Sequence, residues 1–332
     1  MTYANFSLFA AVGVGLILAC GPAGKSQNTV TKETIDSWME GELSNWGRWG
    51  EDDQMGTVNL ITPEKRLAAI ALVEKGIAVS LARNVEKNQA SDNPHPFGHR
   101  MLNLGTNPGN GQFVSDNYEV SYHGYAHSHM DALIHMSYKG KSYNGFSQAE
   151  HAVESGATKL AVTAFKKGIM TKGILMDIPR LKGVEYLEPG TPIYPEDLAS
   201  WEKEAGFTVE PGDVVFIYTG RWKLRDKKGP WEASSKSAGL YASSAKWLHE
   251  RDIAMIGSDA ASDVAPSGVE GVRQPIHQLF LIAMGTPIFD NCDLEDLAEE
   301  CRRQNRWEFL LTASPIPVTG GTGSPLNPIA TF

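Results

Sequence analysis

Residues 123–135 read HGYAHSHMDALIH, a stretch that places four of the nine histidines of the chain within thirteen positions. In an extended chain, side chains two positions apart lie on the same face, so His127, His129 and Asp131 are expected to project together. His123 has the same parity, and the glycine after it permits a bend that would bring its imidazole toward the others. Imidazoles grouped with a carboxylate suit Zn²⁺, Mn²⁺ or Fe²⁺. The stretch therefore predicts a metal site rather than a polar strand face that happens to be rich in histidine.

The spacing around Asp131 also carries a family resemblance. With His129 two positions before it and His135 four after it, Asp131 resembles the core of the motif His-x-Gly-Thr-His-x-Asp-x-Pro-x-His. That motif marks the cyclase-like metal-dependent hydrolases, which include bacterial kynurenine formamidases and isatin hydrolases. Further segments resemble those of the longer members of this family, in the same order along the chain: residues 46–60, 211–221, 277–288 and 321–328.

The resemblance implies roles for particular residues. It implies that His129 and Asp131 bind metal and that His135 is the acid–base histidine. His277 matches a later ligand of the family. An acidic ligand is expected about twelve positions further on, and Asp290 stands thirteen on, where Glu is usual.

The first histidine of the family motif has no counterpart at the same position. Tyr125 stands there, six residues before Asp131. His123 is the preferred replacement as a ligand, and His127 is the next candidate.

These residues predict a reaction. A divalent ion, Zn²⁺ or Mn²⁺, present as one or two ions, lowers the pKa of bound water from 15.7 to about 7 and polarises a carbonyl group. His135 would take a proton from that water and return it to the leaving nitrogen. Trp46, Trp49 and Trp222 are candidate walls of a substrate pocket, because aromatic substrates favour flat apolar surfaces, with core packing as the alternative.

The expected function is hydrolysis of a carbon–nitrogen bond outside peptides. The resemblance implies an aryl formamide such as N-formylkynurenine, which would make the protein an arylformamidase of tryptophan catabolism. A cyclic amide or lactone, such as isatin or a dienelactone, is the alternative substrate. A lipoprotein that captures metal or a ligand without catalysis is the alternative from another class. The resemblance also implies homodimers or homotetramers.

Composition limits the fold and the partners. The chain has 332 residues, 42% of them hydrophobic and 21% charged, which excludes disordered and collagen-like classes. A net charge of −9 without a basic block argues against nucleic-acid binding. Alternating helix and strand signals predict one α/β domain over residues 33–332, a mixed sheet with surrounding helices that resembles the swivelling β/β/α fold of the cyclase-like hydrolases. The expected helices include residues 195–205, 241–251 and 293–304, and the expected strands include 113–122, 174–178, 214–218 and 253–256.

The first residues are typical of an export signal. Residues 1–20 hold no charged side chain and are almost continuously apolar from residue 6, a run too short to span a bilayer comfortably. The run ends in Ile-Leu-Ala-Cys-Gly, which resembles a bacterial lipobox in which Cys20 would be lipidated. Residues 21–32 are expected to form a flexible tether. The predicted location is periplasmic or membrane-anchored through Cys20, with a cytoplasmic protein as the alternative.

Overall fold

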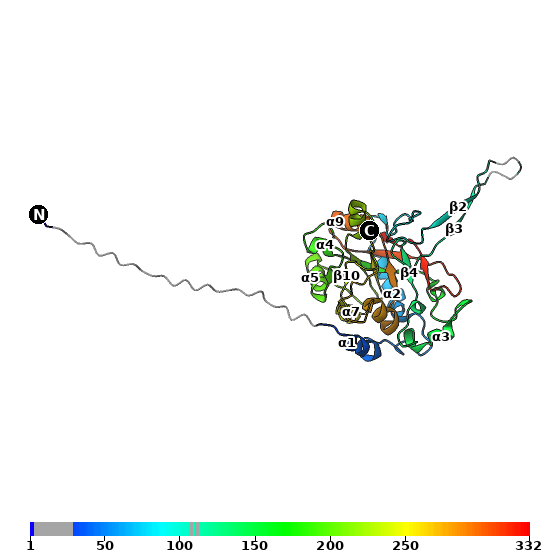
Figure 1. Ribbon diagram of the computed structural model, residues 1–332, viewed down its shortest axis with the longest axis horizontal. Coiled ribbons are helices and arrows are strands. Elements are labelled where there is room, and N and C mark those ends of the chain that lie inside the picture. The colour runs from blue at the N-terminus through cyan, green and yellow to red at the C-terminus, as the bar shows by residue number, and fades with distance from the viewer. Residues whose placement is uncertain (3–28, 107–108, 110–112) are drawn as a thin grey trace.

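The computed structural model describes residues 1–2, 29–106, 109 and 113–332 (Figure 1). Cys20 and most of the expected signal and tether lie outside the described residues. Val30, near the end of the expected tether, is buried in the core, and Lys32 already begins helix α1 (Lys32–Ser37). The described fold therefore begins ahead of the expected boundary at residue 33. Across the described segments, none of the helices has the length and apolar composition that crossing a bilayer requires.

A mixed sheet forms the centre of the molecule. In the described part of the chain its nine strands lie in the order β1-β15-β13-β7-β9-β11-β12-β4-β14. The central strands β7, β9, β11 and β12 run parallel, and the pairings on both sides of them are antiparallel. The bounds are β1 (Ala78–Ser80), β4 (His129–Asp131), β7 (Ile169–Asp177), β9 (Val214–Tyr218), β11 (Met255–Ser258), β12 (Ile288–Asp290), β13 (Glu308–Ala313), β14 (Gly323–Pro325) and β15 (Ile329–Thr331). This arrangement confirms the expected mixed α/β sheet.

Helices connect the parallel strands, as parallel pairing requires. Helix α5 (Pro195–Ala205) begins with proline at its first position, where no backbone N–H is needed, and ends at Gly206 in the left-handed conformation. The other connecting helices are α4 (Ile178–Leu181), α6 (Arg221–Lys228), α7 (Ser244–His249) and α8 (Pro275–Gln278) with its continuation η6 (Leu279–Met284). Helix α9 (Glu295–Gln304) follows β12 and leads to the antiparallel strand β13. Ahead of β7 in the chain lie α2 (Pro63–Ile70), α3 (Gln148–His151) and the short turns η1 (Trp38–Glu42), η2 (Gly56–Leu60), η3 (Leu133–His135), η4 (Tyr143–Gly145) and η5 (Val162–Phe165).

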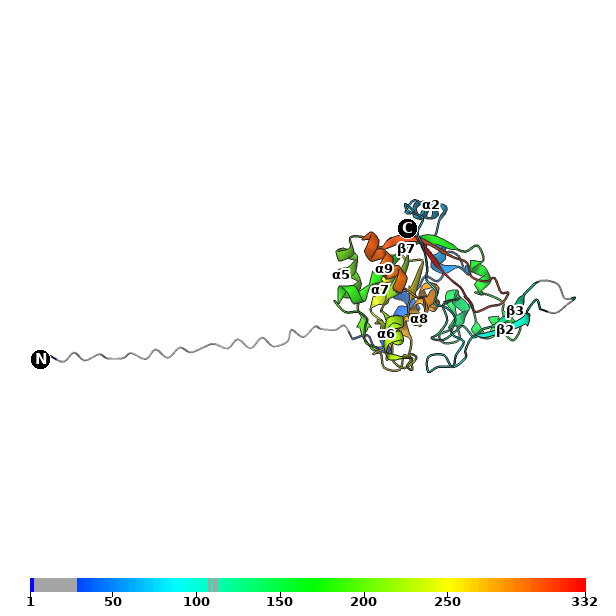
Figure 2. The same ribbon diagram turned by 90° about the horizontal axis from the view of Figure 1, so that it is seen from above.

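A hairpin projects from the body of the molecule (Figures 1 and 2). It consists of β2 (Gly98–Asn103) and β3 (Ser115–Glu119), which pair antiparallel. The remaining strands form two-residue pairs: β5 (Ala152–Val153) with β6 (Gly156–Ala157), and β8 (Pro192–Ile193) with β10 (Gly239–Leu240).

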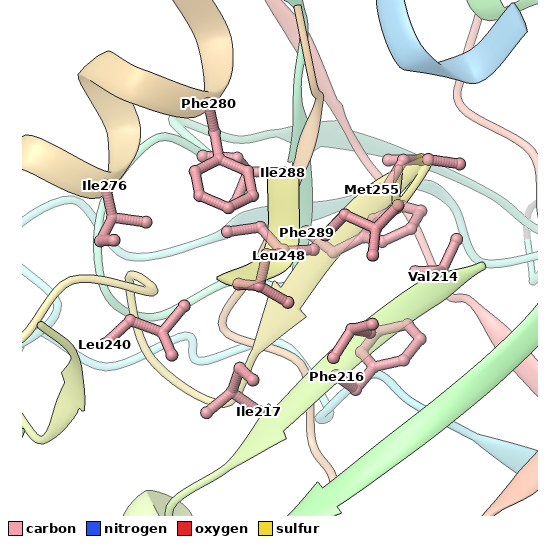
Figure 3. Packing of buried hydrophobic residues seen from close by; sticks show 14 of the residues in the cluster. Val214, Phe216, Ile217, Leu240, Leu248, Met255, Ile276, Phe280, Ile288 and Phe289 are labelled. Carbon is pink, nitrogen blue, oxygen red and sulfur yellow. The ribbon is translucent and has the colours of Figure 1, made fainter. Parts of the chain in front are cut away.

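The core packs against both faces of the sheet. On one face the ring of Phe216 stacks on that of Phe289, with 5.9 Å between their centroids. Figure 3 shows Ile276 and Phe280 projecting from the α8–η6 segment toward the strands, where Ile288 lies. Because side chains alternate along a strand, Ile288 and Asp290 share a face of β12. The α8–η6 segment therefore covers the face on which Asp290 projects.

Candidate metal centre

Strand register brings the predicted ligands together. In the antiparallel pair of β12 and β4, Asp290 lies opposite His129, and Ile288 lies opposite Asp131. Directly opposed residues project to the same face of a sheet, so His129, Asp131 and Asp290 face the same side. All three side chains are almost completely buried, at 1–3% exposure. The sheet alone thus places one imidazole and two carboxylates side by side.

The first group of potential ligands consists of His123, His129 and Asp131, whose ligand atoms all lie within 4.8 Å of one another. His123 Nδ1 is 2.9 Å from Asp131 Oδ1, and His129 Nε2 is 3.4 Å from the same oxygen. His123 reaches this position because Gly124, with a φ of 151°, turns the chain in a way that favours glycine.

The second group shares Asp131 with the first. It consists of Asp131, His277 and Asp290, again with all ligand atoms within 4.8 Å. His277 Nε2, delivered by α8, is 3.1 Å from Asp290 Oδ2 and 3.7 Å from Asp131 Oδ2. Asp131 therefore turns Oδ1 toward the first group and Oδ2 toward the second.

The hydrogen bonds of the imidazoles fit a metal site. His129 Nδ1 donates to the carbonyl of His127 at 2.8 Å, and His277 Nδ1 donates to Asp263 at 2.5 Å. The third ring, His123, uses Nε2 to bond Thr322 at 2.9 Å. In each ring the other nitrogen faces the group of ligands, as metal-binding histidines do.

Two buried atoms lack the partner that a cation would supply. His123 Nδ1 and Asp131 Oδ1 are close together, yet their contact does not have hydrogen-bond geometry and neither atom has a hydrogen bond within the described protein. A buried polar atom without a partner costs about 1–3 kcal/mol. The donor set of three imidazoles and two carboxylates therefore fits one or two divalent ions.

The electrostatics favour the charged carboxylate at the centre. Burial alone would raise the pKa of Asp131, but the neighbouring His135, His123 and His129 outweigh burial and hold it well below its usual range. Burial would likewise lower the pKa of His277, but the carboxylates of Asp290 and Asp263 raise it well above the ordinary value. The protein charges thus hold Asp131 as a carboxylate in the absence of any ion.

His135 lies beside the ligands without belonging to either group. Its ring stacks on that of His123 with 3.9 Å between centroids, and its Nε2 is 3.8 Å from Asp131 Oδ2. Burial lowers the pKa of His135 to about 4, against the opposing effect of Asp131. The side chain is nonetheless 30% exposed, so a neutral imidazole is available next to the site.

His127 belongs to neither group. Strand β4 begins only at His129, so the alternation that would carry His127 to the same face does not extend back to it. Its ring lies at an edge-on angle to Phe97, 6.0 Å between centroids, and only its backbone carbonyl supports the site.

The three tryptophans expected to form substrate walls, Trp46, Trp49 and Trp222, do not line the cavity next to His123 in the described structure. Trp222 is fully buried and its indole N–H donates to the carbonyl of Cys292, which favours core packing over a substrate wall for this residue. Trp46 donates to the carbonyl of Ile282, and Trp49 lies beneath the guanidinium of Arg48. Neither lines the cavity next to His123 in the described structure.

The structure adds residues that spacing did not single out. Arg221 donates to Asn291 at 2.6 Å, and Asn291 donates in turn to the carbonyl of Gly124 at 2.7 Å. These bonds fix the histidine loop to the end of β12. Asp259 and Asp263 follow β11, and the sequence offers both as site candidates or turn caps. Asp263 orients His277, whereas Asp259 accepts backbone N–H groups of residues 219–221 and caps that turn.

Comparisons with known proteins agree with this geometry. Residues 58–263, more than half of the chain, match the family described as "Putative cyclase". A crystal structure described as a novel cyclase is 32% identical over 87% of this chain and 97% of its own, with a TM-score of 0.79. No curated protein matches the sequence.

Two isatin hydrolases share the fold at lower identity. Isatin hydrolase A from Ralstonia solanacearum is 19% identical over 81% of this chain and 97% of its own, with a TM-score of 0.54. Isatin hydrolase A from Labrenzia aggregata, bound to benzyl benzoate, is 19% identical over 81% and 98%, with a TM-score of 0.55. The family match over more than half of the chain and the 32% identical crystal structure lead to one conclusion: the chain belongs to the cyclase family.

Proposed function

We propose that this protein hydrolyses a non-peptide carbon–nitrogen bond, using a divalent metal and His135 as acid and base. The observation that carries the proposal is the position of Asp131, which shares its two oxygens between two ligand groups while His135 stands 3.8 Å away. Such an ion, when bound, supplies a water that ionises near neutral pH and polarises a carbonyl oxygen.

The residues of the chain would bind the ions and transfer the proton. His123, His129 and Asp131 would hold one ion, and Asp131, His277 and Asp290 a second. His135, neutral and partly exposed, accepts the proton of the attacking water at a ring nitrogen. It then returns that proton to the leaving nitrogen, which is a poor leaving group unless it is protonated.

Two substrate classes follow from the proposal. The sequence motif favours an aryl formamide, cleaved to formate and an amine. A cyclic amide or lactone is the second class, and the cavity next to His123, with a volume of about 190 Å³, has room for the ring of either class. The fold shared with isatin hydrolases supports the same second class.

The test compares variants at the two central residues. Wild type, His135→Ala and Asp131→Ala are assayed with added Zn²⁺ or Mn²⁺ for formate release from N-formylkynurenine and for ring opening of isatin and dihydrocoumarin. We expect His135→Ala to retain its metal and to lose about 10²–10⁴-fold in rate. Asp131→Ala should lose both metal and activity, because it removes a ligand from each group.

A matched control is His99→Ala, which removes a histidine on the projecting hairpin. It should behave as wild type in metal content and rate. Equal activity in wild type, His135→Ala and Asp131→Ala would contradict the proposal.

A further inference from the structure

A cavity opens beside the first ligand group. Its volume is about 190 Å³, and its walls include His123 itself together with Tyr122, Tyr125, Asp92 and Glu232. None of the described residues that line it is a lysine or arginine. The cavity therefore offers no cationic partner to an anion, and it accommodates a small molecule that approaches the ligands from the side of His123.

Tyr125 stands in this wall at an unusual position. It occupies the place at which the family motif has its first histidine, and His123 fills that place in the first ligand group. Tyr125 is consequently not needed as a ligand, and it is one of the residues that line the cavity.

The backbone around Tyr125 is held rigidly. Its carbonyl accepts a hydrogen bond from Arg221, whose guanidinium is 3% exposed. Arg221 also bonds Asn291, and Asn291 bonds the carbonyl of Gly124. A group that stabilises developing charge is effective when its position is fixed before the reaction, and these bonds supply that fixation.

The phenol of Tyr125 is available as a hydrogen-bond donor. Among the described residues, none forms a hydrogen bond with its hydroxyl group. A phenol ionises only near pH 10, so the group carries its proton at neutral pH.

We propose that Tyr125 donates its phenolic hydrogen to the substrate carbonyl oxygen as that oxygen becomes an oxyanion. This inference rests on the proposed hydrolysis and adds a catalytic residue to it. The substrate it implies is a small, neutral carbonyl compound whose ring or short chain occupies the cavity. A substrate with a free carboxylate meets Glu232 in the wall, which disfavours it, whereas the charge of Asp92 is paired with Arg225.

The test replaces Tyr125 with Phe, which removes only the hydroxyl group. We expect kcat to fall about 10²-fold for the best substrate, because removing one oxyanion donor costs that much, and KM to rise about three- to tenfold, because the phenol already bonds the ground-state carbonyl. Metal content should equal that of wild type. Tyr118→Phe, on the exposed face of the hairpin, is the matched control and should leave all three quantities unchanged.

Three outcomes of this assay would overturn the inference. They are an unchanged kcat in Tyr125→Phe, a loss confined to KM, and a loss of bound metal, which would make Tyr125 a structural support for the ligands.

A binding measurement separates this inference from the proposed function. Titration calorimetry with 2-oxindole, a neutral bicyclic lactam that offers a carbonyl acceptor, requires no turnover. We expect 2-oxindole to bind wild type and Tyr118→Phe equally and Tyr125→Phe about three- to tenfold more weakly, the effect of one lost hydrogen bond. If wild type hydrolyses none of the substrates, the proposed function fails and the calorimetry alone decides the role of Tyr125. The inference about Tyr125 is overturned if 2-oxindole binds Tyr125→Phe as tightly as wild type, or if it does not bind wild type.

Discussion

At the scale of single residues, Asp263 controls how His277 meets a metal ion. Asp263 accepts the Nδ1 hydrogen of His277 at 2.5 Å and also the backbone N–H of Ile276 at 2.7 Å. This carboxylate fixes the tautomer and the ring orientation and increases the basicity of the imidazole. We predict that Asp263→Asn weakens Zn²⁺ or Mn²⁺ binding by about 10–100-fold, measured by calorimetric titration of metal-free protein.

The control for this variant is Asp52→Asn, which changes a carboxylate with a 98% exposed side chain. It should bind metal as wild type does. If Asp263→Asn also binds as tightly as wild type, the hydrogen bond has no influence on the site.

The sequence could predict ligands where regular spacing governs them. His129 and Asp131 lie two apart on one strand, so their shared face followed from alternation alone. His127 lies outside both ligand groups, because β4 begins only at His129. The choice of His123 depended on the backbone angle at Gly124 and on bonds from Thr322, neither of which a spacing pattern contains.

At the scale of elements, the edge strand β14 closes the site. Gly323 lies opposite Asp131, and a Cβ at Gly323 would come 2.3 Å from the carbonyl oxygen of Met130 and 3.2 Å from Cε1 of His123. We predict that Gly323→Ala separates β14 from β4 and displaces His123. The expected loss is about 1–3 kcal/mol in the free energy of unfolding, measured by denaturant titration, together with weaker metal binding.

Gly41→Ala is the matched control, because a Cβ at Gly41 meets nothing within 4 Å. It should leave metal binding unchanged. Wild-type metal affinity in Gly323→Ala would show that β14 does not position His123.

Elements with strong local signals were predicted well. The observed bounds of α5 and β9 equal the expected ones, because proline and glycine mark the ends of α5 and a continuous apolar run marks β9. Strand β7 begins at Ile169 rather than 174, since its polar Thr171 and Lys172 are buried by partners elsewhere in the chain. The burial of such polar residues depends on tertiary contacts, which a local sequence pattern does not reveal.

At the scale of the whole molecule, the site joins segments that are distant in sequence. Its ligands come from β4 and the loop before it, from α8 and from β12, so residues 123 and 290 meet only in the folded chain. The unfolded chain offers no such arrangement. An ion that binds the folded protein alone stabilises it by about 2.7 kcal/mol when its concentration is 100 times its Kd.

We therefore predict that the metal stabilises the entire domain. Treatment with EDTA should lower the Tm of wild type in differential scanning calorimetry, and Zn²⁺ or Mn²⁺ should restore it in a concentration-dependent way. Asp131→Ala supplies the decisive comparison, because it removes the one carboxylate common to both ligand groups. Its Tm should respond to neither EDTA nor added metal. A wild-type Tm that is the same with EDTA as with saturating metal would mean that these five side chains do not hold an ion, because tight binding to the folded state alone must raise its stability.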